Sequence, residues 1–225
     1  MDPIEIDLLA IERGTVTAPA GCGKTQLIAN ALARHRGNKP ILVLTHTNAG
    51  VAALRSRLDR AGVPVSAYRL STIDGWAIRL ISTFPGRSAH DPEILGLAAP
   101  ARDYPAIRDA AWKLLQAGHV SEVLKSSYAH LIVDEYQDCL VSQHNIVYFL
   151  SLILPTCVLG DPMQAIFGFG GNALADWNKH VCAHFPVVGE LTTPWRWRNA
   201  GAESFGTMVA GGSSPVSGGT FGGSA

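Results

Sequence analysis

A glycine-rich segment that ends in lysine and threonine is the first part of the sequence that could do chemistry. The run APAGCGKT, residues 18–25, follows a predicted strand and opens a predicted helix. Gly21 and Gly23 let backbone N–H groups turn toward phosphate oxygens, and the helix N-terminus adds positive partial charge. Lys24 would then contact the β- and γ-phosphates, and the Thr25 hydroxyl would bind Mg²⁺. The segment predicts a P-loop nucleotide site, with alanine where the strict pattern begins with glycine.

Adjacent carboxylates form a second candidate feature. The run HLIVDEYQD, residues 130–138, is an apolar strand that ends in Asp134 and Glu135. At the carboxyl end of a parallel strand, Asp134 could bind Mg²⁺ through water, and Glu135 could polarise an attacking water. Phosphoryl transfer depends mainly on positioning and charge neutralisation. Together with the P-loop, these residues predict a basic NTPase.

The elements that must position these residues alternate between strand and helix along the chain. Short apolar runs predict strands at Thr15–Thr17, Ile41–Thr45, His130–Asp134, Thr156–Leu159 and Val187–Leu191. Helical periodicity predicts helices at Lys24–Arg36, Ala49–Ala61, Ile73–Ile81, Pro105–Ala117, Leu140–Leu154 and Leu174–Phe185. This alternation predicts an α/β fold, a parallel sheet flanked by helices. We expect one domain over residues 1–205, with a small helical insert at about 83–127, and a flexible Gly/Ser-rich tail at 206–225.

Composition narrows the class of protein. Hydrophobic residues make up 47% of the 225 residues and the formal net charge is zero, which excludes overall disorder and a global basic field for nucleic acid. The four cysteines form no CxxC pair, which argues against a zinc site or a disulfide scaffold. The acidic N-terminus does not resemble a signal peptide, and the most apolar run is too short to span a bilayer. We therefore expect a cytoplasmic protein without a membrane partner.

Several ordered segments resemble one family. In chain order, LTHTNAGVAALRSRL (44–58), STIDGWAIRLI (71–81), DEYQD (134–138), VLGDPMQAIFGFGGN (158–172) and LTTPWRW (191–197) are similar to elements of UvrD/Rep-type superfamily 1 DNA helicases. The resemblance implies a RecA-like, P-loop NTPase domain, the first motor domain of such a helicase. It would bind and hydrolyse ATP with Mg²⁺ and couple hydrolysis to binding of, and translocation along, single-stranded DNA.

The same resemblance implies individual roles. Gln164 would sense the γ-phosphate, Arg196 would contact it as an arginine-finger-like charge, and Trp195 would stack on the adenine. The implied catalytic residues are Glu135, Lys24, Gln164 and Arg196; the nucleotide contacts are Ala20, Gly21, Cys22, Gly23, Lys24, Thr25, Gln26 and Trp195; the Mg²⁺ ligands are Thr25 and Asp134; and the DNA contacts are Thr45, His46, Thr72, Phe167 and Phe169.

The sequence also departs from the family pattern. No glutamine precedes Gln26 to read adenine, Asp74 replaces a histidine, and Gly170 replaces an arginine. A second motor domain has no counterpart in these residues, so a second domain or partner chain would have to complete the motor. We therefore expect the isolated chain to bind Mg·ATP, to hydrolyse it slowly at best, and not to unwind DNA.

Alternative functions follow from the same residues. A GTPase would need an NKxD element, and Asn178-Lys179 is followed by His-Val; a nucleotide kinase would need an arginine-rich lid, which is not evident. A nucleotide-gated interaction module with negligible hydrolysis, and one half of a split helicase, both stay open. Residues 54–88 carry six arginines against two aspartates, which fits either a strand-binding surface or a solvated helix face.

Overall fold

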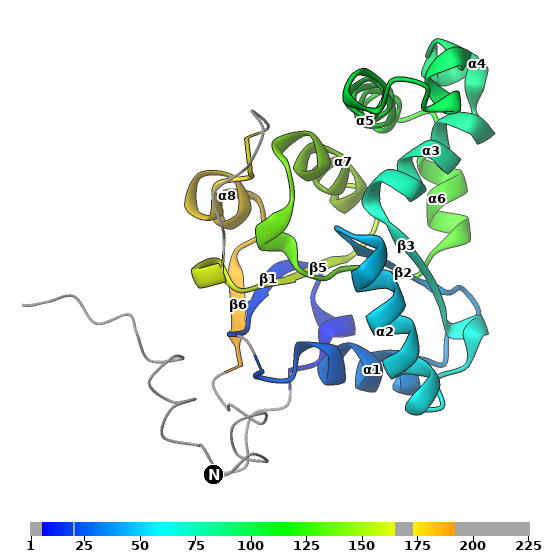
Figure 1. Ribbon diagram of the computed structural model, residues 1–225. Coiled ribbons are helices and arrows are strands. Elements are labelled where there is room, and N and C mark those ends of the chain that lie inside the picture. Colours follow the sequence, from blue (N-terminus) through cyan, green and yellow to red (C-terminus); the bar gives the residue numbers. More distant parts are fainter. Residues whose placement is uncertain (1–5, 20, 165–172, 192–225) are drawn as a thin grey trace, which may run out of the picture.

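Six parallel strands form the centre of the structure (Figure 1). The computed structural model describes residues 6–19, 21–164 and 173–191. The strands are β1 Arg13–Thr17, β2 Ile41–Thr45, β3 Tyr68–Thr72, β4 Leu131–Val133, β5 Thr156–Gly160 and β6 Val187–Glu190. Their order is β3-β2-β4-β5-β1-β6, and every neighbouring pair is parallel. The predicted α/β class, a RecA-like sheet flanked by helices, is confirmed.

Helices cover both faces of this sheet (Figure 1). The longer ones are α1 Lys24–Arg34, α2 Asn48–Arg60, α3 Ile73–Thr83, α5 Pro100–Gln116 and α7 Val141–Ser151, and the shorter ones are α4 Pro85–Ser88, α6 Ser121–Ser127 and α8 Cys182–His184. Short turns complete the described chain: η1 Leu8–Ala10, η2 Val65–Ala67, η3 Pro92–Gly96, η4 Tyr136–Asp138, η5 Pro162–Gln164 and the π-type turn η6 Trp177–Val181. No helix in these described segments is long and apolar enough to cross a membrane.

Alternate residues of the central strands supply two separate cores. In β2, Ile41 and Val43 pack with α1 and α2, whereas Leu42 and Leu44 pack with α3, α5 and α7. All five residues of β2 are buried, because both faces of the strand are covered. Coverage on both faces explains why the sequence of β2 is a continuous apolar run, ILVL, without polar alternation.

Strand β3 and the start of two helices differ from the sequence prediction. Strand β3, YRLST, is an edge strand whose side chains are mostly partly exposed, so its sequence lacks the apolar run that identifies the central strands. Helix α5 begins at Pro100 and contains Pro105, the predicted first residue. The helix predicted from Leu174 begins only at Trp177, because Leu174 bridges to Leu140 and Asp176 caps the following turn.

The helical insert packs on the rest of the fold. Helix α5 contacts α3 and α7, and its residues Ile107 and Leu114 are buried in the shared core. Trp112 of α5 stacks on Phe149 of α7 with ring centroids 5.8 Å apart. The insert therefore forms part of the layer that covers one face of the sheet.

Candidate functional site

The P-loop connects β1 to α1 at the carboxyl edge of the sheet. Gly21 and Gly23 have φ angles of 80° and 90°, the left-handed region that favours glycine, and the second of them directly precedes α1. The Ala18 N–H donates to the Gly160 carbonyl at 3.0 Å, which fixes the start of the loop to the end of β5. The two predicted glycines therefore provide the turn that a phosphate cradle requires.

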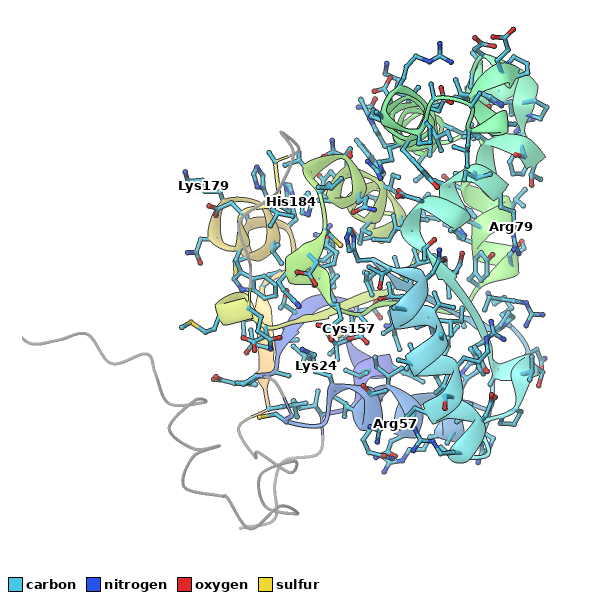
Figure 2. The ribbon with its side chains drawn as sticks, in the orientation of Figure 1. Lys24, Arg57, Arg79, Cys157, Lys179 and His184 are labelled. Carbon is cyan, nitrogen blue, oxygen red and sulfur yellow. The ribbon has the colours of Figure 1, made fainter. Side chains whose placement is uncertain are left out.

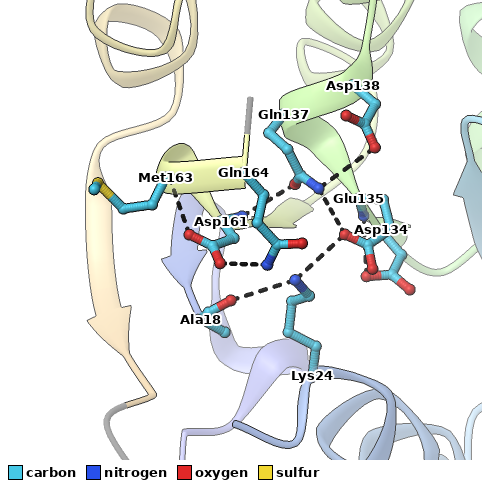
Figure 3. Close-up of polar contacts among 9 residues, drawn as sticks. All are labelled: Ala18, Lys24, Asp134, Glu135, Gln137, Asp138, Asp161, Met163 and Gln164. Carbon is cyan, nitrogen blue, oxygen red and sulfur yellow. Dashed lines mark hydrogen bonds and ion pairs between the residues drawn. The ribbon is translucent and has the colours of Figure 1, made fainter. Parts of the chain in front are cut away.

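Lys24 lies at one end of a polar cluster (Figure 3). Its residue is only 8% exposed, and its Nζ donates to the Ala18 carbonyl and forms an ion pair with Glu135 Oε2, both at 3.3 Å. A buried ammonium must be paired or hydrogen-bonded. The partners of Lys24 are thus the loop itself and Glu135, the predicted catalytic carboxylate.

The two carboxylates after β4 lie in different environments. Asp134 is 7% exposed, and burial, with the neighbouring Glu135 charge, raises its pKa to about 6, while Lys24 acts in the opposite direction. The Glu135 side chain is 40% exposed, and its backbone adopts a left-handed conformation with φ 52°. This strained backbone directs consecutive carboxylates to separate positions, one buried and one accessible to water.

Tyr136 anchors this turn to the helical layer. It is fully buried, and its hydroxyl forms a 2.9 Å hydrogen bond with Nδ1 of His144 on α7. Desolvation of the buried imidazole lowers the pKa of His144 to about 4, with a smaller contribution from His184 and His180. The ring is therefore neutral at physiological pH, and the anchor does not depend on pH there.

Gln137 joins the carboxylates to the end of β5. Its Nε2 donates to Glu135 Oε2 at 2.8 Å, and its Oε1 accepts from the Asp161 N–H at 3.0 Å. A Cβ on Gly160 would lie 2.9 Å from this Oε1, so only glycine leaves room for the amide. Neighbouring strands β4 and β5 are thus connected at their carboxyl ends through one side chain.

Asp161 extends the cluster to Gln164. One carboxylate oxygen accepts from the Met163 N–H at 3.0 Å, and the other accepts from Gln164 Nε2 (Figure 3). Sequence reasoning assigned no role to Gln137 or Asp161. The sequence feature that could have identified these two residues is their position just after a buried parallel strand, where ligand-binding residues of open α/β sheets gather.

Three further predicted nucleotide contacts lie within the described residues. Cys22 is buried and its N–H donates to the Pro19 carbonyl at 3.1 Å. Thr25 is partly buried in the first turn of α1, and Gln26 Nε2 donates to Asn30 Oδ1 at 2.8 Å along the exposed face of this helix. The other predicted contacts lie outside the described residues: Ala20, Phe167, Phe169, Trp195 and Arg196.

The remaining predicted contacts to single-stranded DNA lie at the ends of β2 and β3. His46 and Thr72 line a pocket of about 400 Å³ where β2 and β3 end. Thr45 is only 2% exposed, and a Cβ on Gly50 would lie 2.7 Å from its hydroxyl oxygen, so its side chain is covered from that direction. Two of these three residues thus share one accessible pocket, and DNA contact by all three stays a prediction.

The arginines of residues 54–88 are distributed over four elements. They lie on α2, β3, α3 and α4, and Figure 2 shows Arg57 and Arg79 at separate places on α2 and α3. Arg69 donates to the Val65 and Tyr68 carbonyls, and Arg87 donates to the His119 carbonyl. A charge cluster in the sequence is therefore spread out in space.

The residues present fit a nucleotide with Mg²⁺. Two glycines at positive φ beside a buried lysine suit a phosphate cradle, and Thr25 and Asp134 carry oxygen atoms of the kind that Mg²⁺ prefers as ligands. Burial, with the neighbouring Glu135 charge, raises the pKa of Asp134, so a cation beside this carboxylate would be favourable. Among the described residues, no cluster of three or more His, Cys, Asp or Glu side chains could hold a metal alone.

Comparison with protein families agrees with this geometry. The model of a family described as AAA domain matches residues 7–170, which is more than half of the chain and includes β1 to β5 with all the described residues of the polar cluster. Comparison with curated proteins finds no match. The chain therefore belongs to the AAA domain family, a P-loop NTPase-type domain that is found in UvrD/Rep-like helicases.

Proposed function

We propose that this chain is the ATP-binding and ATP-hydrolysing motor domain of a UvrD/Rep-like DNA helicase, which couples ATP to binding of and movement along single-stranded DNA. The observation that carries the proposal is the continuous polar chain from Lys24 through Glu135, Gln137 and Asp161 to Gln164. This chain of contacts joins the proposed phosphate cradle to the segment in which the resemblance implies contacts to single-stranded DNA.

Lys24 and Glu135 have linked roles in this proposal. Their side chains form an ion pair across 3.3 Å. When Lys24 instead contacts phosphate, the Glu135 carboxylate becomes free to accept a proton from water, as a general base must. Thr25 and Asp134 would hold Mg²⁺, which would supply positive charge beside the phosphates of ATP.

Gln137 and Gln164 provide the coupling. Because Gln137 bonds both the Glu135 carboxylate and the Asp161 backbone, any change in the position of Glu135 alters the support of the β5 end. Asp161 in turn holds the Gln164 amide. We infer that occupation of the phosphate site is transmitted along this chain to the strand-binding segment.

ATP turnover with and without single-stranded DNA tests this function. We expect slow hydrolysis that single-stranded DNA accelerates, and loss of hydrolysis in Glu135→Gln. Hydrolysis that does not respond to DNA would contradict coupling. Nucleotide binding with no turnover in either condition would instead favour a nucleotide-gated interaction module, and activity that appears only with a second polypeptide would favour a split motor.

A further inference from the structure

A second pocket lies beside the nucleotide site, where β2 and β3 end and α2 and α3 begin. It measures about 400 Å³, and the residues that line it include His46, Thr72, Asp74, Ile78 and Tyr104. Tyr104 belongs to α5, in the helical insert, whereas the other residues lie at the ends of β2 and β3 or on α3. The insert therefore forms one wall of this pocket.

Asp74 in the pocket wall is electrostatically compensated. Arg108 of α5 donates to both Asp74 carboxylate oxygens, from Nε at 2.7 Å and from an NH2 group at 2.6 Å. Arg108 is itself 8% exposed, and its guanidinium lies under the Tyr104 ring, 5.6 Å from the ring centroid. The bidentate ion pair and the cation–π contact hold the side chains of Arg108 and Tyr104 in the wall. The pocket thus offers an aromatic ring and an aliphatic side chain without an unpaired carboxylate, a lining that suits a heterocyclic base.

Gln143 of α7 determines which nitrogen of His46 carries a proton. Gln143 Nε2 donates to Asp74, which only accepts, at 3.2 Å, and its Oε1 accepts from the Leu140 N–H at 3.0 Å. These two partners fix the orientation of the amide. The 3.2 Å contact between Gln143 Oε1 and His46 Nδ1 therefore requires hydrogen on Nδ1, which leaves Nε2 of the neutral ring as an acceptor.

We propose that this pocket binds one base of the single strand, with the Tyr104 ring packed on the base and His46 Nε2 accepting an N–H from the base edge. The proposal rests on the proposed strand-binding function and assigns a part of it to the helical insert. A phosphate group fits this position less well, because phosphate oxygens also only accept. Arg108, Asp74 and Gln143 act as positioning residues, since they hold the two contacting side chains.

Equilibrium binding of a fluorescent oligodeoxycytidine to the full chain tests the contribution of Tyr104. Cytosine is chosen because its exocyclic amino group is a donor. Tyr104→Ala should weaken binding at least about fivefold, since stacking contributes roughly 1–3 kcal/mol per base. Tyr104→Phe, which keeps the ring, should bind as the natural chain does, and Mg·ATP affinity should be unchanged in both variants.

The same assay separates this inference from the proposed function. If the natural chain binds the oligonucleotide and Tyr104→Ala binds equally well, the base pocket is wrong and strand binding stands. If the natural chain binds no single-stranded DNA, both are overturned. Arg108→Gln should weaken binding. Lys113→Gln removes an exposed charge of the same helix whose ion-pair partner, Asp109, is also exposed, and it should have little effect. Equal losses in the two variants would show that Arg108 contributes only its charge.

Nitrogen-15 NMR of the His46 ring tests the positioning role directly. At about pH 8 the natural chain should show hydrogen on Nδ1, and Gln143→Met should shift the ring toward the form with hydrogen on Nε2. A structural role of Gln143 alone would not move this signal. Hydrogen on Nε2 in the natural chain would overturn the acceptor role of His46, whether or not the variant folds.

Discussion

Replacing Asp134 by asparagine should stabilise the nucleotide-free protein, although it removes a proposed Mg²⁺ ligand. Burial and then the Glu135 charge raise the pKa of Asp134 to about 6, compared with about 3.9 for a free aspartate. A rise of about two units corresponds to roughly 3 kcal/mol of destabilisation when the carboxylate is ionised. Asparagine keeps an oxygen that can accept the Glu135 N–H, which now bonds Asp134 Oδ1 at 3.0 Å. We therefore expect a gain of about 2–3 kcal/mol near pH 8.

The pH dependence of this stability gain tests whether the ionised Asp134 carboxylate causes it. Since the pKa is raised in the folded state, the destabilisation is complete above pH 6, declines as the pH falls through 6, and disappears below about 3.9. Urea unfolding of both proteins should show a smaller gain near pH 5 than near pH 8. Asp109→Asn, at a half-exposed carboxylate of α5, should change stability by less than about 0.5 kcal/mol. If Asp134→Asn is no more stable near pH 8, or if its gain does not shrink at the lower pH, the reasoning is refuted.

Three further substitutions test the rest of the site. Lys24→Ala should reduce Mg·ATP affinity at least about tenfold by calorimetry, because a charge-assisted phosphate contact is lost; unchanged affinity would remove Lys24 from the site. Glu135→Gln should keep ATP affinity and lower turnover about 10²- to 10⁴-fold, and turnover equal to the natural chain would show that Glu135 is not the base. Gly160→Ala should lower stability by about 1–3 kcal/mol and reduce turnover, because its Cβ would lie 2.7 Å from the Trp177 ring and 2.9 Å from Gln137 Oε1. A stable, fully active Gly160→Ala protein would show that the amide of Gln137 is not needed where it lies.

The sequence was sufficient to predict the strands of the central sheet and the phosphate loop. Strands β2, β4 and β5 are doubly covered, so their apolar runs identify them with bounds correct to within one residue. Gly21 and Gly23 were predicted to let the backbone turn toward phosphate, and both adopt positive φ angles, which glycine favours. The edge strand β3 was missed because its partly exposed surface requires no apolar run.

Contacts between distant segments could not be read from the sequence. Gln137 meets the Asp161 backbone because β4 and β5 are neighbours, and the strand order is a property of the tertiary fold. The Asp74–Arg108 pair likewise depends on how α5 packs on α3. At residue 74 the sequence showed only a departure from the family pattern, and the structure supplies the partner that makes an aspartate acceptable there.

The effect of Mg·ATP and single-stranded DNA on each other's binding affinity tests the central claim most directly. In the Glu135→Gln protein, where ATP should persist, Mg·ATP affinity can be measured with and without single-stranded DNA, and DNA affinity with and without Mg·ATP. A chain that couples the two sites must change both affinities by the same factor. We predict that each ligand shifts the affinity of the other by at least about fivefold, and that Gln137→Leu, which removes the link between Glu135 and Asp161, reduces this factor while both ligands still bind. Affinities that are independent of each other would contradict the account.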